Sequence, residues 1–230
     1  MAKENVCSCI DCENAWPVFK RLSHDELEFI NQSRFEATFK PGEVIIKQGS
    51  PASNVVFLVN GMAKVYMEGQ GGRNLIINIA RPGGMIVGPG IYTDQRQMFT
   101  VSALNDIRAC FIDTNVIRKM VRQNNEFAEG IIIDISHKSQ YNMNRLMSMT
   151  QKKMPGRVAE ILLYLAESVF ESDEFTLLLS RQELADMSAM AKESVVRILK
   201  EFSNEGIIDT GCPRFRILDR EKLQMISLNG

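Results

Sequence analysis

The pattern of apolar residues changes near Asp113, and this change is the strongest constraint on the fold. Upstream of it, short β-prone runs are separated by turn residues. These runs are Glu43–Lys47, Val55–Val59, Lys64–Met67, Leu75–Ala80 and Thr100–Ile112. Several short strands at this spacing predict an antiparallel barrel or sandwich. Downstream the pattern becomes helical, so we expect an α+β protein with a strand-rich domain followed by a helical one.

Local signals predict element ends in the N-terminal half. Residues 22–35 fit a short helix with apolar positions at Leu22, Leu27, Ile30 and Phe35. Ser23 is the expected N-cap, and Glu26 three residues later completes a capping box. Asn60-Gly61 lies between two β-prone runs. It predicts a hairpin with a type I′ turn, because both central residues of that turn need a positive φ.

Residues 126–149 predict one long helix, since they contain no proline and a single glycine. Small and apolar residues recur in steps of three and four at Ala128, Ile131, Ile135, Ser139, Leu146 and Met149, with polar Asn142 in step. This narrow seam fits a partner helix, so residues 126–150 are expected to be a dimerisation helix. The alternative is a long surface helix that packs on its own domain.

The segment Lys152–Gly156 predicts a helix break and a domain boundary, because it contains Pro155 and Gly156. Beyond it the pattern predicts three helices and a hairpin. The helices are Arg157–Val169, Ser180–Met187 and Lys192–Ser203, and the hairpin strands are Ile207–Asp209 and Phe215–Leu218. A helix, a second helix, a short turn, a third helix and a hairpin are the elements of a winged helix-turn-helix domain.

The helix predicted at Lys192–Ser203 has one apolar side and one polar side. Val195, Ile198, Leu199 and Phe202 share the side expected to be buried. The opposite side carries Lys192, Glu193, Val196, Arg197 and Lys200. Arginine can bind guanine with two hydrogen bonds, glutamate can accept one from cytosine, and valine can contact a thymine methyl. The alternative is a surface ion pair between Glu193 and Arg197.

Two further groups of polar residues are expected near a DNA backbone. Ser180, Arg181 and Gln182 lie at the start of a predicted helix, where free backbone N–H groups favour a phosphate. Ser180 and Glu183 form a capping box. Arg214 and Arg216 alternate on the predicted hairpin and point to the same side, and the alternative for both is simple solvation.

The net charge argues against a basic nucleic-acid-binding domain. The whole chain carries −1, and residues 151–230 contain 11 Lys and Arg against 13 Asp and Glu, which gives 11 − 13 = −2. Any contact with DNA must therefore come from a local arrangement of charge.

Composition limits the location and the class of protein. No stretch approaches the ~20 apolar residues of a membrane-spanning helix, and the N-terminus does not resemble a signal peptide. We therefore expect a cytoplasmic protein without a membrane partner. No nucleophile–base–acid set or phosphate loop indicates an enzyme. Three of the five cysteines, Cys7, Cys9 and Cys12, suggest free thiols or metal ligands in a reducing compartment.

Over nearly its whole length the chain resembles the Crp/Fnr family of transcription regulators. The resemblance rests on Lys40–Glu43, Gln48-Gly49, Val55–Gly61 and Ala63–Val65 in the first half, and on Ser180–Ala185 and Lys192–Arg197 in the second. It implies a jelly-roll (double-stranded β-helix) domain of the cyclic-nucleotide-binding type and a helix-turn-helix with Glu193 and Arg197 at the base edges. It also implies a homodimer, a palindromic double-stranded DNA site and contact with RNA polymerase.

The resemblance divides the chain into four parts. Residues 1–16 form a flexible cysteine-containing N-terminus, 17–125 the sensory barrel, 126–150 the dimerisation helix and 151–230 the DNA-binding domain. The helix-turn-helix departs from the family pattern at two positions. Ala189 replaces the usual turn glycine, and Ala191 replaces a Ser or Thr N-cap, whose loss costs ~1 kcal/mol.

The expected effector pocket departs further from the members of the family that bind cyclic nucleotides. Gly88 matches the family's first glycine, but Pro89 replaces the glutamate that binds the ribose. Gln97 and Met98 stand where a cationic pair binds the phosphate, and alternation turns Arg96 to the other face. The expected effector is therefore not cyclic AMP.

Oxygen-sensing members of the family hold a [4Fe–4S] cluster with three N-terminal cysteines and one cysteine inside the barrel. By this resemblance Cys7, Cys9, Cys12 and Cys110 are an alternative metal site, because four thiolates are the right number. The spacing of the first three is tighter than in those sensors, and Cys110 also suits a small buried core residue. A further alternative is a regulatory subunit whose C-terminal domain docks on a protein partner.

Overall fold

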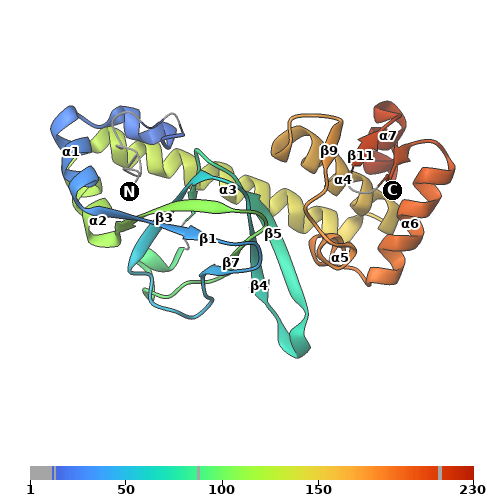
Figure 1. Cartoon of the computed structure of the whole chain (residues 1–230), viewed down its shortest axis with the longest axis horizontal. Helices are drawn as coiled ribbons and strands as arrows, with labels where there is room; N and C mark the ends of the chain where they lie inside the picture. The colour runs from blue at the N-terminus through green and yellow to red at the C-terminus, as the bar shows by residue number, and fades with distance from the viewer. Residues whose placement is uncertain (1–11, 13, 87–88, 212–213) are drawn as a thin grey trace, which may run out of the picture. The chain divides into compact units, whose positions relative to one another are not determined.

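The computed structural model describes residues 12, 14–86, 89–211 and 214–230 (Figure 1). The chain divides into two compact units, residues 1–68 with 78–139 and residues 69–77 with 140–230. Within the described residues, no helix has the length and apolar character needed to cross a membrane.

The N-terminal half of the chain forms two four-stranded sheets. One has the order β1 (Arg34–Phe39), β8 (Ile107–Asp113), β3 (Asn54–Asn60) and β6 (Met85–Ile86). The other has the order β2 (Val44–Ile46), β7 (Thr100–Ala103), β4 (Ala63–Glu68) and β5 (Asn74–Ala80). Buried side chains from both sheets, among them Leu58, Val65 and Val101, form a common core. The predicted jelly-roll is therefore confirmed.

The hairpin predicted at Asn60-Gly61 is wrong. Strand β3 pairs with β8 and β6, whereas β4 pairs with β7 and β5, so this turn carries the chain from one sheet to the other. Gly61 has the positive φ of +80°, and a Cβ there would lie 2.5 Å from the Asp106 carbonyl oxygen. The Asn60 side chain accepts a hydrogen bond from the Arg108 amide at 2.7 Å. Close approach to the β7–β8 turn explains this dipeptide better than a type I′ hairpin.

The first helical segments cover the outer face of the β1–β8–β3 sheet. A short 3₁₀ helix (Pro17–Arg21) precedes α1 (His24–Gln32), and the predicted Ser23–Glu26 capping box is present. The predicted helix extended too far, because Phe35 belongs to β1 and not to α1. Phe35 pairs with Phe111 in the sheet register, and the two rings stack with centroids 4.9 Å apart.

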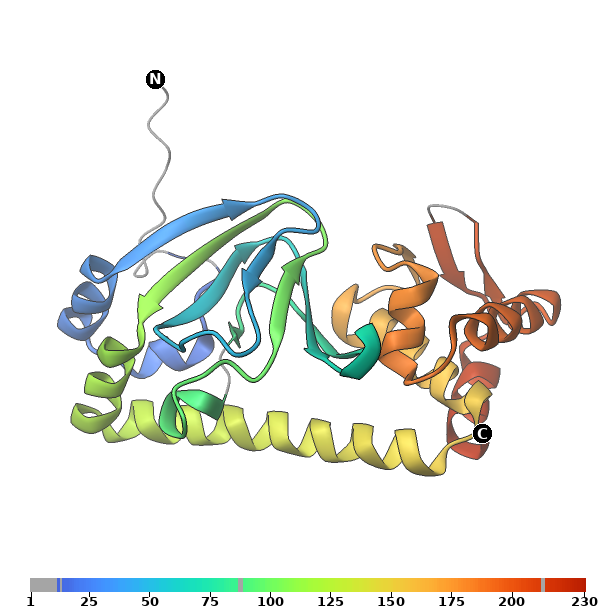
Figure 2. The same ribbon diagram turned by 90° about the horizontal axis from the view of Figure 1, so that it is seen from below.

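The remaining helices of the first unit follow β8. Helix α2 (Thr114–Gln123) is capped by the Asp113 carboxylate, and α3 (Asn125–Gln151) confirms the predicted long helix (Figure 2). The break predicted after it is also present, because α3 ends at Gln151 and α4 (Met154–Tyr164) begins three residues later. Pro155 and Gly156 lie in the first turn of α4 and not in the linker. Proline is tolerated there because the backbone N–H groups of the first turn have no hydrogen-bond acceptor within the helix.

The second unit holds the predicted helix-turn-helix and hairpin. After α4 come a π-helical turn (Leu165–Val169) and β9 (Glu174–Thr176). Then follow α5 (Arg181–Ser188), α6 (Lys192–Asn204), β10 (Ile208–Asp209), β11 (Arg214–Ile217) and α7 (Arg220–Asn229). The three strands form a sheet in the order β10–β11–β9. The sequence pattern missed β9, which has three residues, and α7.

Candidate nucleic-acid interface

Helix α6 separates its apolar and polar residues as predicted. Val195, Ile198, Leu199 and Phe202 are buried. Lys192, Glu193, Val196, Arg197 and Lys200 are exposed, and we call this set the polar edge of α6. The fold thus uses the apolar side for the domain core and leaves the polar edge available to a partner. Contact of this edge with DNA stays a prediction.

The ion pair on this helix differs from the one considered from the sequence. The Arg197 guanidinium donates to Glu201 at 2.7 Å, and no contact with Glu193 is found within the described residues. Glu201 is one helical turn further along, a position that the base-contact pattern did not include. The Arg197 side chain remains 57% exposed, so the pair does not bury its donors.

The turn between α5 and α6 depends on an unusual alanine conformation. Ala189 has φ 52° and ψ 47°, which is the left-handed region. The Met190 amide donates to the Ala185 carbonyl and closes the end of α5. At the next helix start, Ala191 offers no side-chain cap. Ala189 and Ala191, the two departures from the family pattern, therefore both lie at positions where alanine lowers the stability of the domain.

Replacing Ala189 with glycine is expected to raise the free energy of unfolding by roughly 0.5–1 kcal/mol. A left-handed backbone conformation costs an L-residue about 1–2 kcal/mol, and glycine avoids this cost. Part of the gain in stability is lost because glycine also raises the conformational entropy of the unfolded chain. Chemical denaturation followed by circular dichroism measures the change. Ala189→Val should destabilise the domain, and a glycine variant less stable than the parent would contradict this account of the turn.

The start of α5 has the predicted cap. The Glu183 amide donates to the Ser180 hydroxyl oxygen at 3.2 Å, and the Glu183 carboxylate accepts from the Ser180 amide at 2.7 Å. Gln182 is exposed and donates to Asp186 at 2.8 Å. Arg181 is half-buried, and its Nη1 atom has no hydrogen-bond partner among the described residues. Ser180, Arg181 and Gln182 thus lie together at one helix end, as predicted.

The hairpin of β10 and β11, which we call the wing, is paired with a carboxylate on β9 that the sequence analysis did not assign. In the register of the sheet, Arg216 lies opposite Glu174 of β9. The Arg216 Nη2 atom lies 2.9 Å from one Glu174 oxygen, and the Arg214 Nη1 atom lies 3.5 Å from the other. The two wing arginines therefore share one partner. This pairing could not be predicted from the sequence, because it depends on the position of β9, which is too short to be recognised from its pattern.

The C-terminal half of α3 is fixed to the helices that follow it. The Arg145 guanidinium donates to the Met187 carbonyl at the end of α5, and the Ser148 hydroxyl donates to the Glu160 carboxylate on α4. The Tyr141 ring lies 5.7 Å from the Tyr164 ring. Burial, with a smaller contribution from Tyr164, raises the pKa of Tyr141 above its ordinary value. The helix-turn-helix is thus tied to the end of α3.

The predicted dimer seam on α3 needs one correction. Ile131 is 7% exposed and belongs to the core of the first unit, so it does not face a partner helix. Its neighbour Ile132 is 64% exposed. An exposed apolar stripe is formed by Ile132 and Ile135 in the first unit and by Met143 and Leu146 in the second. The sequence predicted the helical period of the seam, but it did not show which of the adjacent residues Ile131 and Ile132 packs into the core.

Of the residues predicted to form an effector pocket, the structure describes Gln97 and Met98. Gln97 is 5% exposed and its Oε1 atom has no partner among the described residues, whereas Met98 is 45% exposed. Adjacent side chains thus enter different surroundings, and their place in an effector pocket stays a prediction. Arg96 lies at the surface and donates to the Gly49 carbonyl at 2.8 Å, as expected. Gly88 lies outside the described residues.

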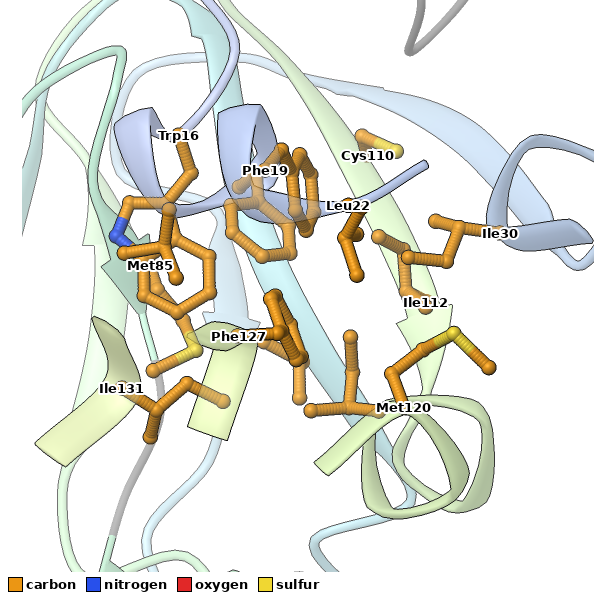
Figure 3. Packing of buried hydrophobic residues seen from close by; sticks show 14 of the residues in the cluster. Trp16, Phe19, Leu22, Ile30, Met85, Cys110, Ile112, Met120, Phe127 and Ile131 are labelled. Carbon is orange, nitrogen blue, oxygen red and sulfur yellow. The ribbon is translucent and has the colours of Figure 1, made fainter. Parts of the chain in front are cut away.

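An aromatic cluster covers the outer face of the β1–β8–β3 sheet (Figure 3). The Trp16 ring packs on Phe19, Phe57 and Phe127 with centroid distances of 5.6 to 6.0 Å. Beside this cluster is an apolar cavity of about 30 Å³, and its lining includes both Cys12 and Cys110. The cavity brings an N-terminal cysteine and a strand cysteine to the same place.

The resemblance implied that Cys110 lies inside the barrel, but the structure places it elsewhere. It faces the covered outer side of its sheet, because neighbouring Ala109 and Phe111 fill the core between the sheets. The Cys110 sulfur accepts a contact from Arg34 Nη1 at 3.7 Å. Cys7 and Cys9 lie outside the described residues. Among the residues the structure does describe, no group of three or more His, Cys, Asp or Glu side chains is placed to hold a metal ion.

Two family models match the chain, one on either side of α3. A cyclic nucleotide-binding domain matches residues 36–124, and a Crp-like helix-turn-helix domain matches residues 156–226. The chain is also similar to the CRP-like cAMP-activated global transcriptional regulator of Mycobacterium tuberculosis. That similarity is 22% identity over 211 residues, which are 90% of this chain and 94% of the relative.

Two solved structures share the fold. FixK2 from Bradyrhizobium japonicum has a TM-score of 0.76 at 20% identity, over 84% of this chain and 96% of that one. A putative transcriptional regulator of the crp/fnr family from Eubacterium rectale has a TM-score of 0.77 at 18% identity, over 94% and 100% of the two chains. Both halves of the chain thus have relatives in the same order.

Proposed function

The chain belongs to the Crp/Fnr family of transcription regulators, and we propose that it binds a palindromic DNA site as a homodimer under the control of a signal sensed in its jelly-roll domain. It is not an enzyme. The DNA-bound dimer contacts RNA polymerase, and the protein works in the cytoplasm.

The observation that carries the proposal is the exposed polar edge of α6. Five residues, Lys192, Glu193, Val196, Arg197 and Lys200, occupy one side of a helix whose other side is buried. Arginine and glutamate one turn apart supply a donor pair for guanine and an acceptor for cytosine. A recognition helix of this type enters the major groove with its N-terminal residues at the base edges.

The direct test is selection of bound sequences from a pool of randomised duplexes. We expect a palindrome whose half-sites are separated by about one helical turn of DNA, ~34 Å, because a two-fold dimer places its two recognition helices that far apart. Footprinting upstream of the protein's own gene then locates natural sites. A pool that shows no enriched sequence would contradict sequence-specific binding.

The dimer is supported by the exposed stripe on α3. Ile132, Ile135, Met143 and Leu146 are each at least 49% exposed in the single chain. Exposed apolar side chains at helical spacing favour association with a second helix, since they lose contact with water on pairing. A signal in the jelly-roll that changes how two such helices pair will change the separation of the two recognition helices.

Cyclic AMP is expected to bind weakly or not at all. A buried cyclic phosphate needs a positive charge, and Gln97 and Met98, where the family's cationic pair would stand, are both neutral. Isothermal titration calorimetry should give no heat of binding beyond dilution, and cyclic AMP should leave the affinity for the selected DNA unchanged. Micromolar binding would overturn this prediction.

A second candidate function is an iron–sulfur sensor, because Cys12 and Cys110 line one cavity. Cys7, Cys9, Cys12 and Cys110 would hold a [4Fe–4S] cluster, which supplies sensitivity to oxygen when bound. Protein purified without oxygen should then be coloured and contain iron and sulfide, and Cys110→Ser should lose both. A colourless, iron-free sample of the parent protein would exclude this candidate.

A further inference from the structure

Three arginines expected to face DNA are already paired with carboxylates. Arg197 of α6 is held by Glu201 at 2.7 Å. Arg216 and Arg214 of the wing are held by Glu174 at 2.9 and 3.5 Å. The two lysines of the polar edge, Lys192 and Lys200, have no such partner among the described residues. We call Glu174 and Glu201 the paired carboxylates.

Glu201 lies where a bound duplex would feel its charge. It is one turn beyond Arg197, about 6 Å along the helix axis, on the same exposed side of α6. Its side chain is 47% exposed. A groove that accepts Arg197 brings this exposed carboxylate within the negative potential of the phosphates, and like charges repel.

Glu174 has the same relation to the wing. The two arginines occupy alternate positions on β11, so both side chains lie on one face of the sheet. Glu174 lies on the neighbouring strand, directly opposite Arg216, and contacts both guanidinium groups. The positive charge of the wing is thus partly neutralised before any DNA arrives.

We propose that the paired carboxylates Glu174 and Glu201 suppress binding to DNA that lacks the cognate sequence. The inference rests on the proposed function and adds a source of specificity to it. Non-cognate binding depends on phosphate contacts alone, and these need free cations. Each paired carboxylate occupies arginine donors and repels phosphates.

A cognate site is affected less by Glu201. There Arg197 gains two parallel hydrogen bonds to a guanine, which replace its exposed pair with Glu201. An exposed ion pair is weak enough for such an interaction to displace it. Glu201 therefore lowers non-cognate affinity more than cognate affinity, whereas Glu174, whose arginines are expected to contact phosphates, lowers both. The net charge of −2 on residues 151–230 agrees with this device, since the domain does not rely on bulk positive charge.

The test compares Glu201→Gln, Glu174→Gln and the double variant with the parent protein. Fluorescence anisotropy measures binding to a labelled duplex of scrambled sequence and to the duplex obtained by selection. The matched control is Glu205→Gln, because Glu205 ends α6 and pairs with Lys222 at 2.9 Å, away from the arginines. It removes one negative charge per chain without releasing a DNA-facing arginine.

We expect each test substitution to tighten binding to the scrambled duplex by about three- to tenfold in the dimer. For Glu201→Gln, binding to the selected duplex should tighten less, so the ratio of the two affinities falls, whereas Glu174→Gln should tighten binding to both duplexes. The salt dependence of scrambled-duplex binding should become steeper by ~0.9 for each additional phosphate that the protein neutralises. Glu205→Gln should change the affinity by less than twofold.

Two results would overturn the inference while leaving the proposed function intact. In one, the parent prefers its selected duplex but the test variants bind scrambled DNA no more tightly than Glu205→Gln does. In the other, Glu201→Gln tightens binding to both duplexes equally, which indicates a simple effect of net charge. Failure of the proposed function is a separate outcome, in which the parent shows no preference for any sequence.

Discussion

An Arg197→Ala variant is expected to lose about 2–6 kcal/mol of binding free energy at the palindromic site. One arginine that binds guanine with two hydrogen bonds contributes about 1–3 kcal/mol, and the dimer uses two copies. The Arg197 side chain is 57% exposed and its ion pair lies at the surface, so its loss should leave the fold intact. Anisotropy titration against the selected duplex measures the affinity, and circular dichroism checks the fold.

The matched variant is Arg197→Lys, which keeps the charge but loses the planar pair of donors. It should retain much of the salt-dependent affinity and lose preference at one base pair in each half-site. If Arg197→Ala leaves both affinity and sequence preference unchanged, the alternative in which the C-terminal domain docks on a protein partner gains support.

An Ile135→Asp variant is expected to be monomeric and to lose DNA binding by several orders of magnitude. Pairing two α3 helices would bury one charge from each chain, and burying an unpaired charge costs several kcal/mol. The folded single chain tolerates the change, because Ile135 is 49% exposed. Sedimentation velocity measures the oligomeric state, and anisotropy measures the effect on DNA.

The control for this prediction is Ile133→Asp. Ile133 is two residues away on the same helix and 42% exposed, but it points well away from the stripe of Ile132, Ile135, Met143 and Leu146. This control should remain dimeric and bind DNA like the parent. A dimeric Ile135→Asp variant, or equal disruption by both substitutions, would contradict the proposed interface.

Features fixed by local interactions could be predicted from the sequence. The capping boxes at Ser23 and Ser180 involve residues three positions apart, and both are present. The two sides of α6 follow from helical period alone, and the structure buries the predicted side. The order of the two domains followed from the change in apolar pattern near Asp113, and the family resemblance supplied the type of each domain.

Features that depend on distant contacts could not be predicted. The prediction of a type I′ hairpin at Asn60-Gly61 was wrong because the two flanking strands pair with strands from distant parts of the chain and not with each other. The choice between Ile131 and Ile132 depends on how α3 packs on the sheet, in the cluster that also contains Trp16 and Phe57. Glu174 reaches the wing arginines only because β9 joins the sheet from a position 42 residues earlier in the chain than Arg216.

The measurement that tests the central claim most directly is a 7-deazaguanine scan of the selected duplex, carried out with the parent protein and with Arg197→Ala. This analogue removes the N7 acceptor of one guanine at a time. The parent should lose affinity strongly at one symmetry-related guanine per half-site, and Arg197→Ala should be indifferent to the same change. Equal losses for the two proteins at every guanine would show that Arg197 does not contact a base.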